Sequence, residues 1–190
     1  GYHATFMCAP KLEGTMASGW HLHQSLADAA TGENTFAEPA GEIGLSPEGR
    51  YWVAGLLRHA RAGALFAAPT VNGYRRYKAH GMAPDRIQWS RDNKGAMLRV
   101  VVHQPGAARV ENRTGEPLAN PYLYLVSQAF AGRDGVDTRA EPPPPSATPY
   151  DSNAPALPTN LGEAIESLNA SAFYRHVLGH DFVNYYVHLK

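Results

Sequence analysis

A strict alternation over residues 18–26 constrains the local fold more than any other feature of the chain. The odd-numbered positions carry His21, His23 and Ser25, and the even-numbered positions carry larger apolar or amide side chains. Because side chains of a strand point alternately to its two faces, the pattern predicts a strand with one polar face. Two imidazoles at i and i+2 can bind one metal ion, or one ion and a neighbouring phosphate. An H-x-H pattern also arises by chance, so a purely structural histidine stays open.

A second charged row occupies residues 109–113. Arg109, Glu111 and Arg113 alternate as cation, anion and cation, and therefore share one face if the segment is a strand. One interpretation is a solvated ladder of ion pairs, each worth about 0 to 1 kcal/mol. The other is a metal-binding carboxylate between two guanidinium groups that bind phosphate or carboxylate.

Further basic side chains occur in the middle of the chain, at Arg75, Arg76, Arg91, Lys94 and Arg99. Phosphoryl transfer requires positioned cations around the phosphate oxygens. Arginines around a histidine and glutamate site suit that chemistry, although ordinary surface residues would show the same spacing.

The remaining pattern predicts alternating helices and strands. A helix is expected from Ser46-Pro47 through Leu65, closed by Pro69, and a long loop over 70–84. Strands are expected over 86–90 and 96–103. Further helices are expected from Asn120-Pro121 to about Arg133, with Gly135 as the stop, and over 161–168 and 181–189, after an irregular proline-rich segment at 141–158.

Composition narrows the class of protein. The 190 residues are 44% hydrophobic and 18% charged, and 17 Lys+Arg balance 17 Asp+Glu. A chain of this balance resembles an ordinary globular domain and shows no preference for nucleic acid or an acidic membrane. Cys8 is the single cysteine, and no apolar run is long enough to cross a bilayer. We therefore expect a reducing cytoplasm as the compartment.

Four ordered runs resemble the glutamine synthetase family. SGWHLHQSL is similar to its ATP-binding run, and APTVNGYRRYKAHGMAP to N-P-T-x-N-S-Y-K-R-L-x-P-G-x-E-A-P. SRDNKGAMLRV resembles S-x-R-N-R-S-A-x-x-R-I, and RVENR followed by ANPYLYLVSQAFAGRDGV resembles R-I-E-x-R and N-P-Y-L-x-x-A-x-x-x-A-G-x-D-G. The resemblance covers residues 4–140.

The resemblance implies roles for ten residues. His21 and Glu111 would bind the divalent metal, Mg²⁺ or Mn²⁺. Glutamate would be bound through Arg76 and Arg113, with Gly19 and His21 beside it. ATP would be contacted by His23, Ser25, Lys94, Arg99 and Arg109. Arg99 and Arg113 would also act in catalysis, by neutralising charge that develops during the reaction.

The family implies a fold and a reaction. We expect an α+β fold in which a curved antiparallel sheet carries the ligands and helices back it. Residues 1–190 would be the C-terminal portion of the catalytic domain, without the N-terminal domain and the first catalytic strands. ATP would phosphorylate the γ-carboxylate of glutamate, and an amine would attack the acyl phosphate. The resemblance also implies a homo-oligomer, a double ring in the family, and an inactive isolated fragment.

Departures from the family pattern concern the amine substrate, the contact to the amino group of glutamate and the phosphate side of the site. Met82 stands where the family has a glutamate that helps bind ammonium, and Met16-Ala17 replaces Asn-Gly. Lys94 keeps a charge but loses the planar fork of arginine. Because a thioether suits an apolar amine better than a small cation, Met82 and the neighbourhood of Trp20 favour an organic amine, as in γ-glutamylanilide or γ-glutamylpolyamine synthetases.

Other functions stay open at this point. The chain fits a glutamine synthetase that uses ammonia, or an inactive family member kept for assembly. Without the resemblance, His21, His23 and Glu111 would also suit a metal-dependent hydrolase, which leaves the arginines unexplained. Tyr150 lies near the position of a tyrosine that is adenylylated in some bacterial members, and an ordinary exposed loop tyrosine fits its surroundings better.

Overall fold

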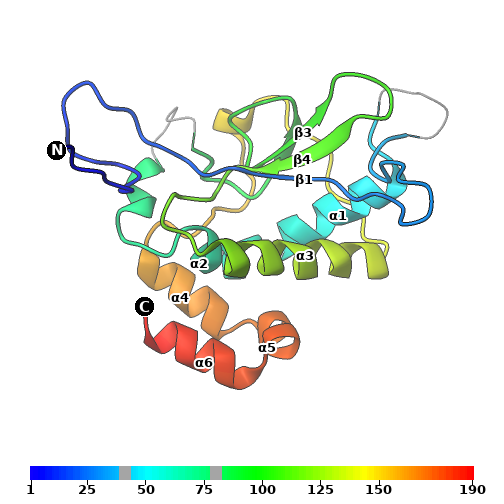
Figure 1. Ribbon diagram of the computed structural model, residues 1–190. Helices are drawn as coiled ribbons and strands as arrows, with labels where there is room; N and C mark the ends of the chain where they lie inside the picture. Colours follow the sequence, from blue (N-terminus) through cyan, green and yellow to red (C-terminus); the bar gives the residue numbers. More distant parts are fainter. Residues whose placement is uncertain (39–43, 78–82) are drawn as a thin grey trace.

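The computed structural model describes residues 1–38, 44–77 and 83–190. Four strands form one sheet in the order β1-β4-β3-β2, with β1 at Leu22–Gln24, β2 at Trp89–Arg91, β3 at Leu98–Val102 and β4 at Ala108–Asn112. Helices cover one face of this sheet, and the other face is turned away from them (Figure 1). The expected α+β class is confirmed.

One of the three strand pairings differs from the expected antiparallel sheet. β1 and β3 both pair antiparallel to β4, whereas β2 pairs parallel to β3. The link between β2 and β3 turns back at Asp92, whose φ of 46° lies in the left-handed region. Side-chain alternation is the same in both directions of pairing, so the sequence pattern does not report strand direction.

The helix predicted from Ser46 is two helices. α1 covers Pro47–Arg58 and α2 covers Ala60–Ala67. The expected start is confirmed, since the Ser46 side chain accepts a hydrogen bond from the Gly49 amide. The break falls at His59, whose Nε2 lies 2.8 Å from Asp134 Oδ2 and whose ring stacks on Phe173.

Helix α3 covers Pro121–Asp137 and packs along α1. Asn120 caps it as expected, by accepting from the amides of Tyr122 and Leu123. Gly135 is not the stop that the sequence predicted. A Cβ there would collide with the carbonyl oxygen of Tyr51, so this glycine allows two helices to approach closely.

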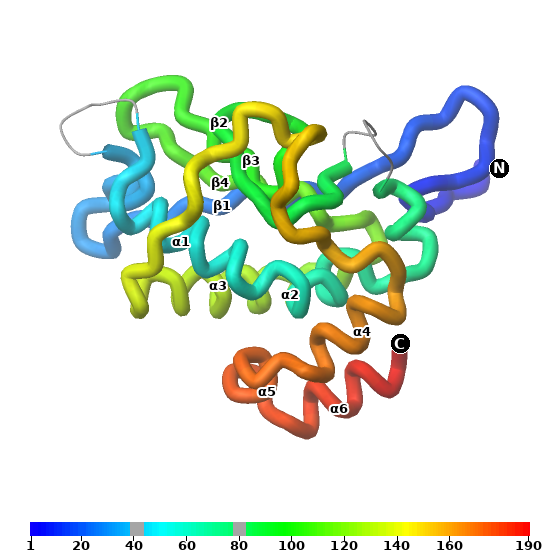
Figure 2. Tube along the Cα trace, turned by 180° about the vertical axis from the view of Figure 1, so that it is seen from behind, coloured from blue at the N-terminus to red at the C-terminus, as the bar shows by residue number. Residues whose placement is uncertain are grey.

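The residues after α3 form an irregular segment beside the sheet and then a layer of helices. The proline-rich segment contains η3, a 3₁₀ turn at Pro149–Asp151, and passes beside β2 (Figure 2, yellow). Three helices follow, α4 at Leu161–Asn169, α5 at Ala172–Leu178 and α6 at His180–His188, of which α5 was not predicted. In the described residues no helix is long and apolar enough to cross a membrane.

The core lies between the sheet and its helices. Leu98 and Val110 on the strands pack with Trp52 and Leu56 of α1. A second cluster joins α2 to the last three helices through Phe66 and Tyr174. Since alternate strand residues face these helices, the intervening residues of β1, β3 and β4 share the opposite face.

Candidate functional site

The strand register places four polar residues in one row across the sheet. Ser90 of β2 lies opposite Arg99 of β3, Arg99 opposite Glu111 of β4, and Glu111 opposite His23 of β1. Directly opposite side chains on the same face are neighbours. The row therefore brings residues separated by up to 88 positions of sequence, from His23 to Glu111, to one site.

Glu111 is the centre of the site. Its side chain is 3% exposed, and Oε1 lies 3.0 Å from His21 Nδ1 and 2.9 Å from Arg113 Nη1. Arg99 Nη1 donates to Oε2 at 3.0 Å. Three donors from three segments thus converge on one buried carboxylate.

The charge state of Glu111 follows from these partners. Burial alone would raise the pKa of the carboxyl, but the hydrogen bonds from His21 and Arg99 and the charge of Arg113 outweigh it, and the pKa falls to about 2. Glu111 is therefore ionised at neutral pH. A buried carboxylate kept ionised in this way is suited to bind a cation.

His23 and Arg109 lie at the outer edge of the site. His23 Nε2 is 3.8 Å from Glu111 Oε1, and Arg109 Nε lies 3.3 Å from His23 Nδ1. Burial and the positive charges nearby lower the pKa of His23, despite the opposing effect of Glu111. A neutral imidazole is the form that binds a metal ion or accepts a hydrogen bond.

Gly19 leaves room for the neighbouring side chains. A Cβ at this position would collide with the His21 ring and would stand 2.8 Å from Arg76 Nη2. Gly19 therefore lies directly against the side chains of His21 and Arg76. Its place beside glutamate stays a prediction.

Arg76 is buried and already holds the backbone. Its Nη1 donates to the carbonyl oxygens of Thr114 and Gly115, and its Nη2 to that of Arg113. The side chain lies beside Gly19, as the predicted glutamate site requires. However, three of its five N–H groups have backbone partners, so it fixes the segment after β4 as well.

Two predicted nucleotide contacts lie further out. Ser25 follows β1 directly and is exposed, and Lys94 is exposed in the link between β2 and β3. Neither is part of the row through Glu111.

The donor set suits part of a metal site. His21 and Glu111 are an imidazole and an ionised carboxylate in direct contact, and both are ligand types for divalent ions. Over residues 1–38, 44–77 and 83–190, no three His, Cys, Asp or Glu side chains gather closely enough to hold a metal alone. The described residues thus fit a shared site that needs further ligands.

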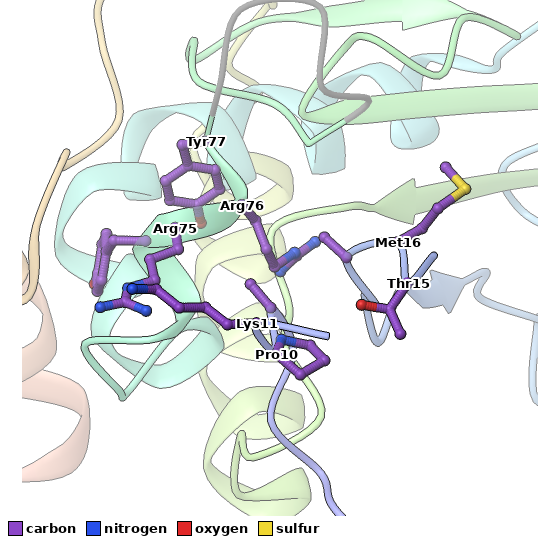
Figure 3. Close-up of a pocket in the computed structure, with 10 residues that line it drawn as sticks. Pro10, Lys11, Thr15, Met16, Arg75, Arg76 and Tyr77 are labelled. Carbon is purple, nitrogen blue, oxygen red and sulfur yellow. The ribbon is translucent and has the colours of Figure 1, made fainter. Parts of the chain in front are cut away.

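A pocket of about 500 Å³ opens beside Arg76. It lies between the segment that carries Thr15 and Met16 and the turn from Tyr74 to Tyr77 (Figure 3). Its walls mix apolar and cationic side chains, which are Ala9, Pro10, Lys11, Thr15, Met16, Ala17, Tyr74, Arg75, Arg76 and Tyr77. The turn forms η2, a 3₁₀ helix at Gly73–Arg76, inside the predicted loop.

Comparison with known proteins identifies the family. The family model described as glutamine synthetase, catalytic domain, matches residues 1–190. The chain belongs to the glutamine synthetase family. It is 47% identical to a gamma-glutamylanilide synthase of an Acinetobacter species and 39% identical to a glutamine synthetase of Archaeoglobus fulgidus, in each case over 100% of this chain.

Solved structures agree with this membership. A structure of GmaS without ligand superposes with a TM-score of 0.84 at 32% identity, and a GmaS complex with ADP with a TM-score of 0.83 at 31% identity. Each covers 98% of this chain. The chain spans 38% and 41% of the two relatives and 43% of the ligand-free GmaS chain.

The two residues on which the inference about an organic amine rested have different outcomes. Met82 lies outside the described residues. Trp20 lies 6.2 Å from Tyr124 of α3 between ring centroids, and therefore on the helix side of the sheet rather than beside His21. Trp20 does not contribute to the face that carries Glu111, so it no longer supports the inference about the amine.

Asp92 lies beside the site and was missed from the sequence, whereas Tyr150, which the sequence singled out only as a loop tyrosine, lies close enough to Arg113 to affect its pKa. Asp92 pairs with Arg99, and it stands where the glutamine synthetase run S-x-R-N-R-S has its first arginine. The ring of Tyr150 rests on Gly95, where a Cβ would come within 2.8 Å of Cζ. The mismatch at Asp92 was visible in the sequence, but nothing local brings Tyr150 to Gly95.

Proposed function

We propose that the protein containing this chain is an ATP-dependent ligase that joins the γ-carboxylate of glutamate to an amine through γ-glutamyl phosphate. The observation that supports it most directly is the ionised Glu111, held by His21, Arg99 and Arg113 at one point. Phosphoryl transfer depends on positioned cations and a bound metal, and this arrangement supplies a carboxylate for the metal between two guanidinium groups.

Each residue has a role in this proposal. His21 and Glu111 hold Mg²⁺ or Mn²⁺, which neutralises phosphate charge when bound. His23, Ser25, Lys94 and Arg109 face the nucleotide, and Arg76 with Gly19 lies at the α-carboxylate end of glutamate. Arg113 orients the γ-carboxylate toward the γ-phosphorus, and Arg99 stabilises negative charge on the transferred phosphoryl group.

The proposed reaction has two steps, phosphoryl transfer to glutamate and then attack by the amine. A γ-carboxylate oxygen bonds to phosphorus as the bond to the ADP oxygen breaks. The amine nitrogen then bonds to the carboxyl carbon of γ-glutamyl phosphate and loses a proton, and inorganic phosphate leaves as the bond between that carbon and the phosphate oxygen breaks. Arg99 and Arg113 remain next to the same oxygens throughout, so charge that develops in either step meets a fixed cation. The GmaS complex with ADP supports a nucleotide site in a protein of the same fold.

An organic amine is the proposed second substrate. The support is the 47% identity to a gamma-glutamylanilide synthase, together with Met82 at the position of the family's ammonium-binding glutamate. The second candidate is a glutamine synthetase that uses ammonia, which the 39% identity to the Archaeoglobus fulgidus enzyme favours. Family membership and the arginines around Glu111 disfavour a hydrolase, and an inactive member would be expected to have lost part of this set.

We also propose how the whole protein is organised. We infer that residues 1–190 are the C-terminal portion of the catalytic domain, that further metal ligands lie upstream, and that the active form is a homo-oligomer. An isolated 190-residue chain should then release no phosphate with glutamate, ATP and amine. Light scattering of the full-length protein, beside that of the isolated chain, measures the assembly directly.

Phosphate release by the full-length protein tests the function. With glutamate, ATP and Mg²⁺ present, we expect release to depend on the amine, and kcat/KM for aniline to exceed that for ammonium. A preference for ammonium over every amine offered would select the second candidate. Release of no phosphate with any amine, by a protein that still binds ATP, would overturn the ligase proposal.

A further inference from the structure

Arg99 lies between two carboxylates from different segments. Its Nε donates to Asp92 Oδ1 at 2.8 Å, its Nη2 contacts the same oxygen, and its Nη1 donates to Glu111 Oε2 at 3.0 Å. The Arg99 side chain is 17% exposed and that of Asp92 is 50% exposed. The two carboxylates therefore hold the guanidinium from its inner and outer sides.

Among the described residues, these contacts leave two N–H groups of Arg99 for a ligand. A guanidinium has five N–H groups in a rigid plane, and three of them are used by Asp92 and Glu111. The remaining two belong to Nη1 and Nη2, one on each. A guanidinium held at both edges has little freedom to rotate, so less conformational entropy is lost when it binds an anion.

The backbone at Asp92 adopts an uncommon conformation to make this contact. Its φ of 46° is left-handed, a region that asparagine and aspartate tolerate better than other residues with a side chain. The amide of Asp92 donates to the Val100 carbonyl at 2.9 Å, which ties the turn to β3 one residue beyond Arg99. Backbone strain of this kind is concentrated at functional sites.

We propose that Asp92 is a positioning residue for the ligase reaction, and that it fixes the Arg99 guanidinium so that its two remaining N–H groups meet the phosphoryl oxygens of the nucleotide. This inference rests on the proposed function. Asp92 itself touches Arg99 and not the reacting atoms, so its contribution passes through Arg99.

An ordinary surface ion pair is the alternative explanation for the contact. Half-exposed pairs contribute little to stability, and an Asp92 of that kind would leave catalysis unchanged. The two explanations predict different results when the Asp92 charge is removed. If Asp92 positions Arg99, its removal slows the reaction when Arg99 is present and has no effect when Arg99 is absent. If the contact is an ordinary surface ion pair, its removal has no effect in either case.

A double-mutant cycle in the full-length protein separates them. Asp92→Asn keeps the shape and the tolerance for positive φ while it removes the charge, and it is combined with Arg99→Ala. We expect Asp92→Asn to lower kcat/KM for ATP about tenfold, as loss of a charged hydrogen bond does, with KM for the amine unchanged. In the Arg99→Ala background the same change should have no further effect.

The control is Asp137→Asn, the same substitution in an exposed ion pair with Arg133 on α3. It should leave kcat/KM unchanged. Unchanged kinetics in Asp92→Asn, or equal losses with and without Arg99, would overturn the inference while an active wild type keeps the ligase proposal. A wild type without amine-dependent phosphate release would instead overturn the ligase proposal itself.

Discussion

Glu111 Oε1 lies 3.0 Å from His21 Nδ1, and the two residues come from segments that pair antiparallel through β1 and β4. The contact joins the imidazole and the carboxylate that the sequence singled out separately. Because Arg99 and Arg113 bind the same carboxylate, changes at Glu111 should affect both stability and activity.

Replacement of Glu111 by glutamine should destabilise the protein and abolish phosphate release. The change removes the charge that compensates Arg99 and Arg113, and loss of one partner of a buried ion pair costs about 3 kcal/mol. Chemical denaturation and the phosphate assay measure the two effects. Glu166→Gln, at an exposed position of α4, is the matched control and should change neither stability nor phosphate release. Full activity in Glu111→Gln would exclude the proposed metal ligand.

Acid should unfold the protein partly through Glu111. The pKa of its carboxyl is depressed from an ordinary value of 4.5 to about 2 in the folded state. A depressed pKa stabilises the fold above the unfolded value, and this stabilisation is lost as the pH falls from about 4.5 toward 2. The contribution at neutral pH is at most about 3 kcal/mol.

Denaturation curves of the wild type and Glu111→Gln over this pH range check the sign. The free energies of unfolding should converge as the pH falls from about 4.5, since the wild type loses what the variant never had. A constant difference between the two proteins down to pH 2 would contradict the assignment of this acid sensitivity to Glu111.

Local sequence patterns predicted which side chains share a face of the sheet. The strand register and the break between α1 and α2 depend on tertiary contacts, which the sequence did not show. The alternation around His21 and Glu111 specified which side chains share a face, because side-chain direction in a strand is a local property. The row from Ser90 to His23 needed the strand register, which the sequence did not give. The break at His59 depends on Asp134 and Phe173, both more than 70 residues away along the chain.

Glycine 19 should be intolerant of any side chain. In Gly19→Ala the new Cβ would collide with the His21 ring and stand 2.8 Å from Arg76 Nη2, so at least one of them must move. We expect loss of most phosphate release with little change in melting temperature, because the segment is exposed. Ser18→Ala, at the exposed neighbouring position, is the control. A fully active Gly19→Ala would show that His21 and Arg76 need not stay where they are.

The contact between Gly95 and Tyr150 should be sensitive to size. A Cβ on Gly95 would come within 2.8 Å of the Tyr150 ring, so Gly95→Ala should displace η3 from the sheet and expose residues 141–158 to proteolysis. Adding Tyr150→Ala should restore resistance, because it removes the colliding ring. The cleavage rates of the two variants measure this, and equal rates in both would contradict a direct contact.

Gly135 could end the helix or allow close helix packing, and these two explanations predict stability changes of opposite sign in Gly135→Ala. If Gly135 only limited helix length, alanine would be the better helix former there and would stabilise the protein by about 1 kcal/mol. In the structure Gly135 lies inside α3, where a Cβ would collide with the Tyr51 carbonyl and lie 2.9 Å from the Gly55 Cα. Both neighbours are backbone atoms of α1, which cannot rotate away.

The helices must therefore separate in Gly135→Ala, and overpacking of this kind costs about 1 to 3 kcal/mol. Denaturant midpoints of wild type and variant measure the change. Gly162→Ala is the control, since the nearest atom to its Cβ would be Oδ1 of the N-cap Asn160 at 3.2 Å, a side-chain atom and not the backbone of a second helix. Stabilisation by Gly135→Ala would mean that the backbones of α1 and α3 are not in contact at Gly135.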